Sequence, residues 1–269
     1  MISLVGAGPG AEDLITVRAV ERLRAAEVVI WASSLVPESL LSYVAKDDAD
    51  IYDSAVMTLE DVLRIYMTNR GKNVVRLHSG DPSVYGAIQE QIDFLNKNDI
   101  EFEVIPGVTS VGAAAAALER ELTVPGVSQS VVFTRLAKKT SASMPNNEHL
   151  ENYARAGGTL CVFLSGAYPK ELQESLLVEG SAYDVDTPAA IFVRVSWEDE
   201  VVEKTTLGKL AISMKKIGAR RTVLVIVGEA LTKEPLRSHL YNPDFAHKFR
   251  KKSRGNTVGR PTAALRTSL

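Results

Sequence analysis

The chain is poor in the residues on which metal centres and disulfide-stabilised folds depend. Its 269 residues include one cysteine, Cys161. A lone cysteine excludes an internal disulfide and a cysteine-cluster metal site, and it fits a reducing cytoplasm. The four histidines are scattered along the chain, at His78, His149, His239 and His247. Because the sequence shows neither a metal-ligand cluster nor a Ser/His/Asp set, we expect no bound metal and no hydrolytic triad.

Long apolar runs are missing as well. No stretch approaches the roughly 18 consecutive apolar residues that a membrane helix needs. The first ten residues, MISLVGAGPG, have no basic segment ahead of a short apolar run, so we do not interpret them as a signal peptide. The hydrophobic share of 45% and the charged share of 24% are those of ordinary globular proteins. We therefore expect a soluble, cytoplasmic protein with no membrane partner.

Charge is distributed unevenly along the chain. The net charge is −2, but residues 232–269 carry nine Lys/Arg and two Asp/Glu, which leaves 22 basic and 31 acidic residues in the remainder. The basic end is poor in core-forming residues, so we interpret it as a flexible, solvated tail. A basic tail can also contact nucleic acid, but the acidic body argues against that partner.

Apolar runs alternate with amphipathic stretches, which is typical of an α/β fold. In the first half we expect strands at Ile2–Val5, Glu27–Trp31, Asn73–Leu77 and Glu101–Ile105. Helices are expected between them, at Leu14–Ala25, Leu59–Asn69 and Tyr85–Asn96.

The composition changes after an alanine-rich helix expected at Ser110–Leu118. Beyond it several strands follow one another without a long helix, which indicates a mixed sheet. We expect these strands at Ser130–Thr134, Thr159–Leu164, Ala189–Val195, Val201–Thr206 and Thr222–Val227, and helices at Asn147–Ala156, Lys170–Glu179 and Leu207–Ile217. The sequence thus predicts two α/β domains, 1–115 and 116–231, followed by the tail 232–269.

A glycine loop, GAGPG at residues 6–10, directly follows the first expected strand. Glycines there permit positive φ and close approach of a ligand to the backbone. The spacing also satisfies G-x-G-x-x-A, so a nicotinamide-dependent reductase is an alternative hypothesis. Two features weaken it. The second strand ends without an acidic residue to hold a ribose hydroxyl, and Pro9 removes one backbone donor.

Two further loops also follow expected strands. The first reads RLHSGDPSVYG and carries Asp81, which could bind an ammonium group, accept hydroxyl hydrogen bonds or cap the following turn. His78 precedes it and is a candidate for contact with a substrate. The second loop reads PGVTS and places hydroxyls at a helix start. Loops at the carboxyl ends of strands in one sheet can face a common crevice, where α/β proteins bind small ligands.

These loops and two later segments resemble the tetrapyrrole methylases. The segments that carry the resemblance read GAGPG, RLHSGDPSVYGAIQEQ, VIPGVTSVGAAAAALERELTVPGVSQSVVFTR and PAAIFVRVSWEDE. Within that family they look most like the branch that methylates C11 of precorrin-4, or of cobalt-precorrin-4, in cobalamin biosynthesis. The resemblance covers about residues 1–231. Another tetrapyrrole, such as uroporphyrinogen III or a different precorrin, is the alternative substrate.

The resemblance implies that S-adenosylmethionine binds in the cleft between the two α/β domains, unlike the arrangement in Rossmann-type methyltransferases, and that S-adenosylhomocysteine is the product. Transferred position by position, the expected donor contacts are Pro9, Ser79, Gly80, Asp81, Val84, Thr109, Ser110, Leu164, Val193 and Thr222. The resemblance also implies a homodimer.

Recognition of a corrin precursor calls for cations, because its acetate and propionate side chains are anionic. Arg135, Lys138, Lys139 and Arg194 are the substrate-binding candidates, since they adjoin the family-like segments. If a proton must be removed, Asp81 and Tyr85 are the nearest candidates for the catalytic group. Methyl transfer itself mainly requires alignment of the donor with the acceptor carbon.

Overall fold

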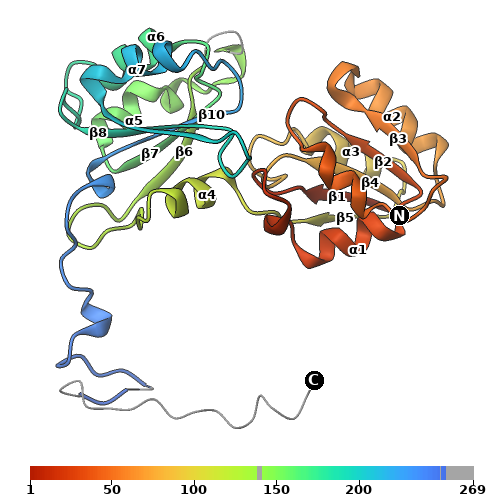
Figure 1. Ribbon diagram of the computed structural model, residues 1–269, viewed down its shortest axis with the longest axis horizontal. Helices are drawn as coiled ribbons and strands as arrows, with labels where there is room; N and C mark the ends of the chain where they lie inside the picture. Colours follow the sequence, from red (N-terminus) through yellow and green to blue (C-terminus); the bar gives the residue numbers. More distant parts are fainter. Residues whose placement is uncertain (138–140, 249, 253–269) are drawn as a thin grey trace.

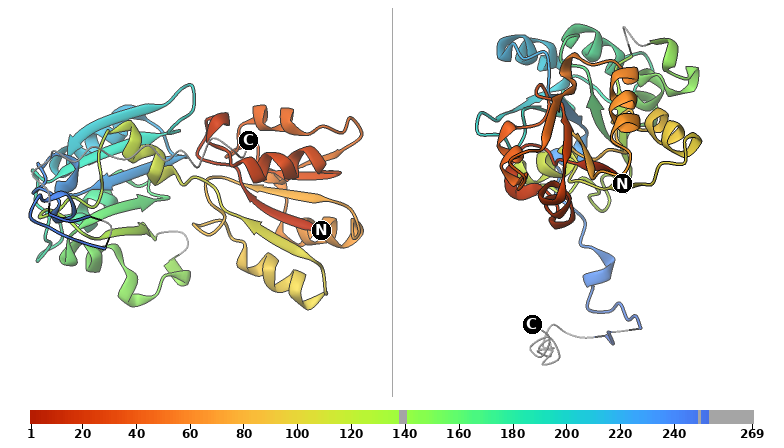
Figure 2. Two further views of the ribbon diagram at one scale, coloured as in Figure 1. Left: turned by 90° about the horizontal axis from the view of Figure 1, so that it is seen from below. Right: turned by 90° about the vertical axis from the view of Figure 1, so that its right-hand side faces the viewer.

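The computed structural model describes residues 1–137, 141–248 and 250–252. These residues form two α/β domains, each built on one five-stranded sheet, and they lie side by side (Figure 1). The predicted fold class is therefore confirmed. The described part of the tail leaves the second domain and extends away from both sheets (Figures 1 and 2). The described residues include no helix long and apolar enough to cross a membrane.

The first sheet is entirely parallel and has the strand order β3-β2-β4-β1-β5. Its strands are β1 (Ile2–Gly6), β2 (Val28–Trp31), β3 (Asp50–Asp53), β4 (Val74–His78) and β5 (Phe102–Ile105). The central strands are buried along nearly their whole length, as expected of a parallel sheet covered on both faces. The edge strand β3 was not predicted. It is largely exposed, so its sequence shows no apolar pattern.

Helices cover both faces of this sheet. They are α1 (Val17–Ala25), α2 (Leu59–Thr68) and α3 (Gln89–Lys97). Leu23 of α1 packs with Val5 and Val29 on one face, whereas Tyr66 of α2 packs with Leu4 on the other. Alternate residues of the same strands thus contribute to separate cores.

The helix predicted to begin at Tyr85 in fact begins at Gln89. Tyr85 and Ala87 have φ angles of +57° and +50°, in the left-handed region that a right-handed helix excludes. Between them, Gly86 lies so close to Pro82 that an added Cβ would stand 2.1 Å from the Pro82 carbonyl oxygen. A tight turn therefore replaces the first turn of the expected helix.

The second sheet is mixed, as predicted, with the order β6-β7-β10-β8-β9. Its strands are β6 (Val131–Arg135), β7 (Thr159–Phe163), β8 (Pro188–Val193), β9 (Val201–Thr206) and β10 (Val223–Val227). β6 and β7 are parallel, and the remaining pairs are antiparallel. The helices of this domain are α4 (Ser110–Ala117), α5 (Leu150–Ala156), α6 (Pro169–Leu176) and α7 (Leu210–Ile217).

Helix α4 lies on one face of the second sheet and α5–α7 lie on the other (Figure 1). Ala114 of α4 packs in one cluster with Cys161 and Phe192, so the lone cysteine is a buried core residue. Because α4 packs with the second sheet, we propose that the two domains divide within residues 106–109, shortly before the expected boundary at residue 115.

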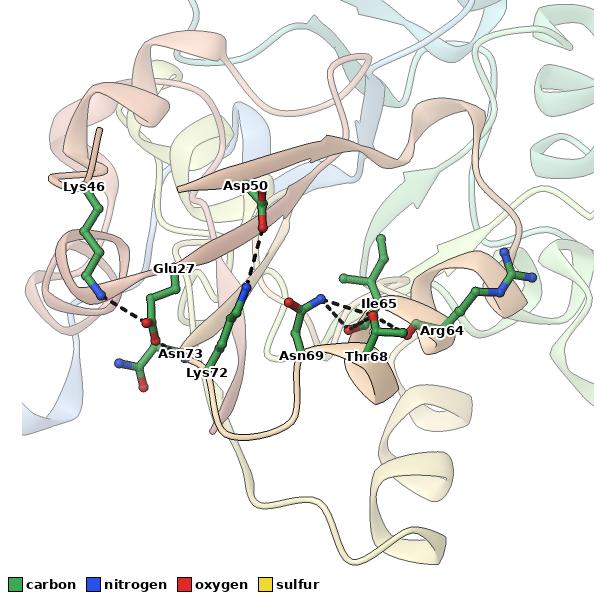
Figure 3. Close-up of polar contacts among 9 residues, drawn as sticks. All are labelled: Glu27, Lys46, Asp50, Arg64, Ile65, Thr68, Asn69, Lys72 and Asn73. Atoms are coloured by element: carbon green, nitrogen blue, oxygen red, sulfur yellow. Dashed lines mark hydrogen bonds and ion pairs between the residues drawn. The ribbon is translucent and has the colours of Figure 1, made fainter. Parts of the chain in front are cut away.

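Polar contacts connect the loops at the amino-terminal edge of the first sheet (Figure 3). Lys46 pairs with Glu27 at 3.5 Å and Lys72 with Asp50 at 3.7 Å, and the backbone N–H of Asn73 donates to Glu27 at 2.9 Å. Exposed pairs of this kind contribute little stability. The opposite edge of the sheet, where the strands end, is the side at which α/β proteins bind ligands.

The close packing of α4 predicts that the same alanine-to-leucine change has different effects on stability on the two sides of the helix. Ala114→Leu should lower the free energy of unfolding by about 1–3 kcal/mol, because Ala114 is fully buried and a larger side chain overpacks the core. Ala116→Leu, on the exposed side of the same helix, should change it by less than about 0.5 kcal/mol. Urea unfolding of both variants measures this difference, and equal losses would contradict the placement of α4.

Candidate functional site

Three loops at the carboxyl ends of β1, β4 and β5 meet backbone to backbone. Gly8 and Gly80 exchange two hydrogen bonds, of 3.2 Å from the Gly8 N–H and 2.8 Å from the Gly80 N–H. A Cβ on Gly6 would stand 2.5 Å from the Gly107 nitrogen, and one on Gly107 would stand 2.1 Å from the Gly80 carbonyl oxygen. Only glycine allows backbones to approach this closely.

The carboxylate of Asp81 connects the second and third loops. It accepts hydrogen bonds from the N–H and hydroxyl of Ser83, with the N–H at 2.8 Å, and from the Gly107 N–H at 2.9 Å. Burial alone would raise the pKa of Asp81, but the hydrogen bonds from Ser83 and Gly107 outweigh it and the pKa is lowered. Asp81 is therefore an anion at neutral pH, and its oxygens already bind backbone groups.

A pocket of about 430 Å³ opens where these loops face the second domain. That volume lies within the range of sites for small molecules. Ten of the predicted site residues line it: Pro9, Ser79, Gly80, Asp81, Val84, Tyr85, Thr109, Ser110, Leu164 and Thr222. The structure thus brings together segments more than 200 residues apart in the chain.

Three of the lining residues have left-handed backbones although they are not glycine. Tyr85, Leu164 and Thr222 have φ angles of +57°, +53° and +54°. Such conformations are costly, above all for a β-branched residue such as threonine, and they gather at ligand sites. The strain supports the view that this pocket is a binding site.

An aromatic contact spans the cleft. The ring of Tyr85, from the first domain, lies 5.2 Å from that of Phe163 on β7, which lies 5.9 Å from that of Phe133 on β6. Burial raises the pKa of Tyr85, while the charge of Arg135 acts in the opposite direction. The phenol is therefore protonated at neutral pH.

Several other predicted residues lie outside the pocket lining. Val193 is buried in the core of the second domain. Arg194 forms an ion pair with Asp199 at 2.8 Å and stacks on Trp197. Arg135 lies at the end of β6, where it donates to Ser143 at 2.9 Å. Lys138 and Lys139 lie outside the described residues.

His78 is buried and does not line the pocket. Burial, followed by the nearby charge of Arg76, lowers the pKa of His78 to about 3, although a hydrogen bond with the backbone of Gly86 acts against this. The neutral imidazole thus supports the turn that carries Tyr85.

Several lining residues were not predicted from the sequence. Ser34 and Leu35 follow β2 and Arg220 and Arg221 precede Thr222. The rule that identified the other loops, a position just beyond a strand end, also applies to Ser34 and Leu35. The arginine doublet adjoins a predicted contact, but sequence alone does not show which way its side chains face.

The first glycine loop does not offer a cradle for phosphate. The N–H groups of Ala7, Gly8 and Ala11 donate to His78, Gly80 and Ser196, at 2.8, 3.2 and 3.0 Å. Pro9 has no N–H, and the Trp197 ring covers Gly10. A pyrophosphate site needs such groups free. The loop geometry therefore disfavours the nicotinamide-dependent reductase.

Comparison with known proteins decides the family. Residues 1–211 match the family model described as Tetrapyrrole (Corrin/Porphyrin) Methylases. The chain belongs to the tetrapyrrole methylase family. This confirms the family predicted from the sequence motifs.

Two tetrapyrrole methylases illustrate the similarity in sequence. A cobalt-precorrin-4 C(11)-methyltransferase from Methanocaldococcus jannaschii is 44% identical over 253 residues, which cover 93% of this chain and 96% of that protein. A precorrin-4 C(11)-methyltransferase from Pseudomonas aeruginosa is 39% identical over 252 residues, covering 93% and 98%.

Solved structures of tetrapyrrole methylases agree with the fold. A cobalt precorrin-4 methyltransferase of cobalamin biosynthesis matches with a TM-score of 0.80 and 38% identity, covering 86% of this chain and 96% of that one. The uroporphyrin-III C-methyltransferase from Thermus thermophilus, complexed with S-adenosylhomocysteine, matches with a TM-score of 0.70 and 28% identity, covering 86% and 98%.

The contact between the glycine loops predicts opposite effects for two glycine substitutions. Gly107→Ala should lower the free energy of unfolding by about 1–3 kcal/mol, because its Cβ would collide with the Gly80 carbonyl oxygen. Gly112→Ala, five residues later in α4, should raise it by about 0.5–1 kcal/mol, since the nearest atom to the added Cβ is Val108 Cγ1 at 3.9 Å, an ordinary contact. Thermal unfolding measures both changes in stability. A Gly107→Ala variant as stable as the wild type would contradict the close approach of the glycine loops.

Buried His78 predicts a pH-dependent stability. Its pKa is about 3 in the folded protein, against an ordinary value of 6.5, so the unfolded chain binds the extra proton between these values. The stabilisation that this pKa difference provides is fully present above pH 6.5 and is lost as the pH falls toward 3. From pH 7 to pH 5 the loss is about 2 kcal/mol. Urea unfolding at both values should show it in the wild type but not in His78→Gln, and equal losses would contradict it.

Proposed function

We propose that the chain is an S-adenosylmethionine-dependent methyltransferase that methylates C11 of precorrin-4, as the metal-free or the cobalt form, in cobalamin biosynthesis. Relatives named for that reaction are 38–44% identical over at least 90% of the chain. The observation that carries the proposal is the interdomain pocket, which gathers nine of the ten residues expected to contact the donor.

The pocket suits a sulfonium donor. Among its described lining residues the charged side chains are those of Asp81, Arg220 and Arg221, and most of the others are apolar. The sulfonium loses its positive charge on the way to product, so apolar and water-poor surroundings favour the transfer. A relative complexed with S-adenosylhomocysteine supports the same donor here.

Asp81 and Tyr85 are the proposed catalytic residues, and the geometry favours a positioning task for both. The lowered pKa of Asp81 makes it a weak base at neutral pH, and it holds two of the loops that form the pocket. Tyr85 stays protonated and can donate a hydrogen bond but cannot accept a proton. Rate acceleration then comes mainly from alignment of donor and acceptor carbon.

Carboxylates of the corrin precursor meet cations at the mouth of the pocket. Arg220 and Arg221 line the pocket and are exposed to solvent. The ion pairs of the described residues include neither of them, so both guanidinium groups can take a ligand. Arg194 is a weaker candidate than expected, because Asp199 and Trp197 already engage it. Arg135 stays a proposed contact, near Tyr85.

The homodimer and the cytoplasmic location implied by the resemblance stay proposals as well. Light scattering at several protein concentrations tests the first, and fractionation of cells that express the chain tests the second.

The arginine doublet yields a prediction about substrate recognition. Arg220→Ala and Arg221→Ala should each raise the KM for precorrin-4 roughly tenfold, because each removes a charge-assisted contact worth about 1–2 kcal/mol. Lys216→Ala removes the same charge from the exposed side of α7, outside the lining, and should leave the KM unchanged. Steady-state kinetics at saturating donor measure all three, and equal KM values throughout would contradict the assignment.

The decisive test is the reaction itself. Incubation of the chain with precorrin-4, or cobalt-precorrin-4, and a donor carrying a carbon-13 methyl group should yield a product that is heavier by one methyl substitution. Carbon NMR should place the label at C11. A label on another carbon, or methylation of uroporphyrinogen III instead, would replace the proposed substrate and leave the enzyme class standing.

A further inference from the structure

A loop of the second domain lies directly across the first glycine loop. It connects β8 and β9, and its Trp197 indole N–H donates to the Pro9 carbonyl oxygen at 2.9 Å. The ring fills the space beside Gly10, where an added Cβ would stand 2.2 Å from the indole Cδ1. The N–H of Ala11 donates to the Ser196 hydroxyl at 3.0 Å. Three successive residues of the first domain are thus held by two residues of the second.

The loop that carries Trp197 is itself held firmly. The guanidinium of Arg194 stands 4.1 Å from the centre of the indole ring and pairs with Asp199 at 2.8 Å. Arg194 and Ser196 have positive φ angles of +49° and +67°, a strain that the surrounding contacts must offset. The cation–π contact orients the ring, so that the indole N–H faces Pro9.

The same loop is connected to the opposite wall of the pocket. The backbone N–H of Arg194 donates to the Thr222 carbonyl oxygen at 3.0 Å, and the N–H of Trp197 donates to the Arg194 carbonyl oxygen at 2.9 Å. Pro9 and Thr222 both line the pocket, from different domains. A short chain of contacts through Trp197 therefore sets how far apart these two walls stand.

We propose that Trp197 is a positioning residue for the methyl donor: its hydrogen bond to Pro9 fixes the first glycine loop against the second domain and so sets the width of the donor pocket. The inference rests on the proposed function, since it takes this pocket to be the donor site. Trp197 does not line the pocket, and it acts through Pro9. Small displacements of such walls weaken binding strongly because the ligand contacts depend on alignment.

Trp197→Phe separates this task from simple packing, because it keeps an aromatic ring beside Gly10 and removes the N–H. We expect the affinity for S-adenosylhomocysteine, measured by calorimetry, to fall about fivefold, as the loss of one hydrogen bond of ordinary strength implies. Ser196→Ala, which removes the acceptor for Ala11, should reduce it by a similar factor. Glu198→Ala changes an exposed residue of the same loop and should leave the affinity unchanged.

Kinetics provide a readout that a purely structural role would not move. In Trp197→Phe the KM for S-adenosylmethionine should rise about as much as the affinity falls, while kcat at saturating donor and the KM for precorrin-4 stay at wild-type values. A variant that binds S-adenosylhomocysteine as tightly as the wild type overturns the inference. So does a uniform loss of kcat with unchanged donor KM.

Failure of the proposed function can be distinguished from failure of the role of Trp197. If the wild-type chain binds no S-adenosylhomocysteine, the proposed function fails, and the inference fails with it. If the wild type binds and Trp197→Phe matches it, only the task assigned to Trp197 is wrong. Should Trp197→Phe not fold, Ser196→Ala alone decides, because it alters one hydroxyl and leaves the indole in place.

Discussion

The meeting of three glycine backbones is the constraint on which the rest of the site depends. Gly6, Gly80 and Gly107 lie so close together that a Cβ on Gly6 or on Gly107 would overlap its neighbours. The loops after β1, β4 and β5 can therefore share one junction, tied by the Gly8–Gly80 hydrogen bonds and by the Asp81 carboxylate. The junction therefore uses several of its polar groups for internal hydrogen bonds.

The internal use of these polar groups bears on which ligand the pocket can bind. A site for phosphate needs free N–H groups, whereas a site for a sulfonium nucleoside needs apolar walls and alignment. The two domains divide the task. The first supplies the glycine junction, and the second supplies Leu164 and Thr222 with strained backbones and the Trp197 contact that holds the glycine loop. The second domain also supplies Arg220 and Arg221, which line the pocket and are exposed to solvent.

Much of the fold could be predicted because each buried strand carries its own signal. The central strands are continuous apolar runs, and their bounds were found to within a residue or two. The edge strand β3 escaped notice because an exposed strand needs no apolar face. The start of α3 was misplaced because the strained turn at Tyr85–Ala87 follows from its neighbours rather than from local propensity. The loops at the strand ends were identified, but the direction of Arg194 was not, since its partners are set by the folded loop.

By itself the sequence determined the alternation of strands and helices and the three glycine-bearing loops, because apolar periodicity and backbone freedom are local properties. Its motifs also carried a resemblance to the tetrapyrrole methylases. Only the tertiary structure decided which of those residues face one pocket, that Arg220 and Arg221 rather than Arg194 stand unpaired at its mouth, and that Trp197 bridges the domains. These contacts join residues as many as 188 positions apart, and no local pattern specifies a contact over that separation.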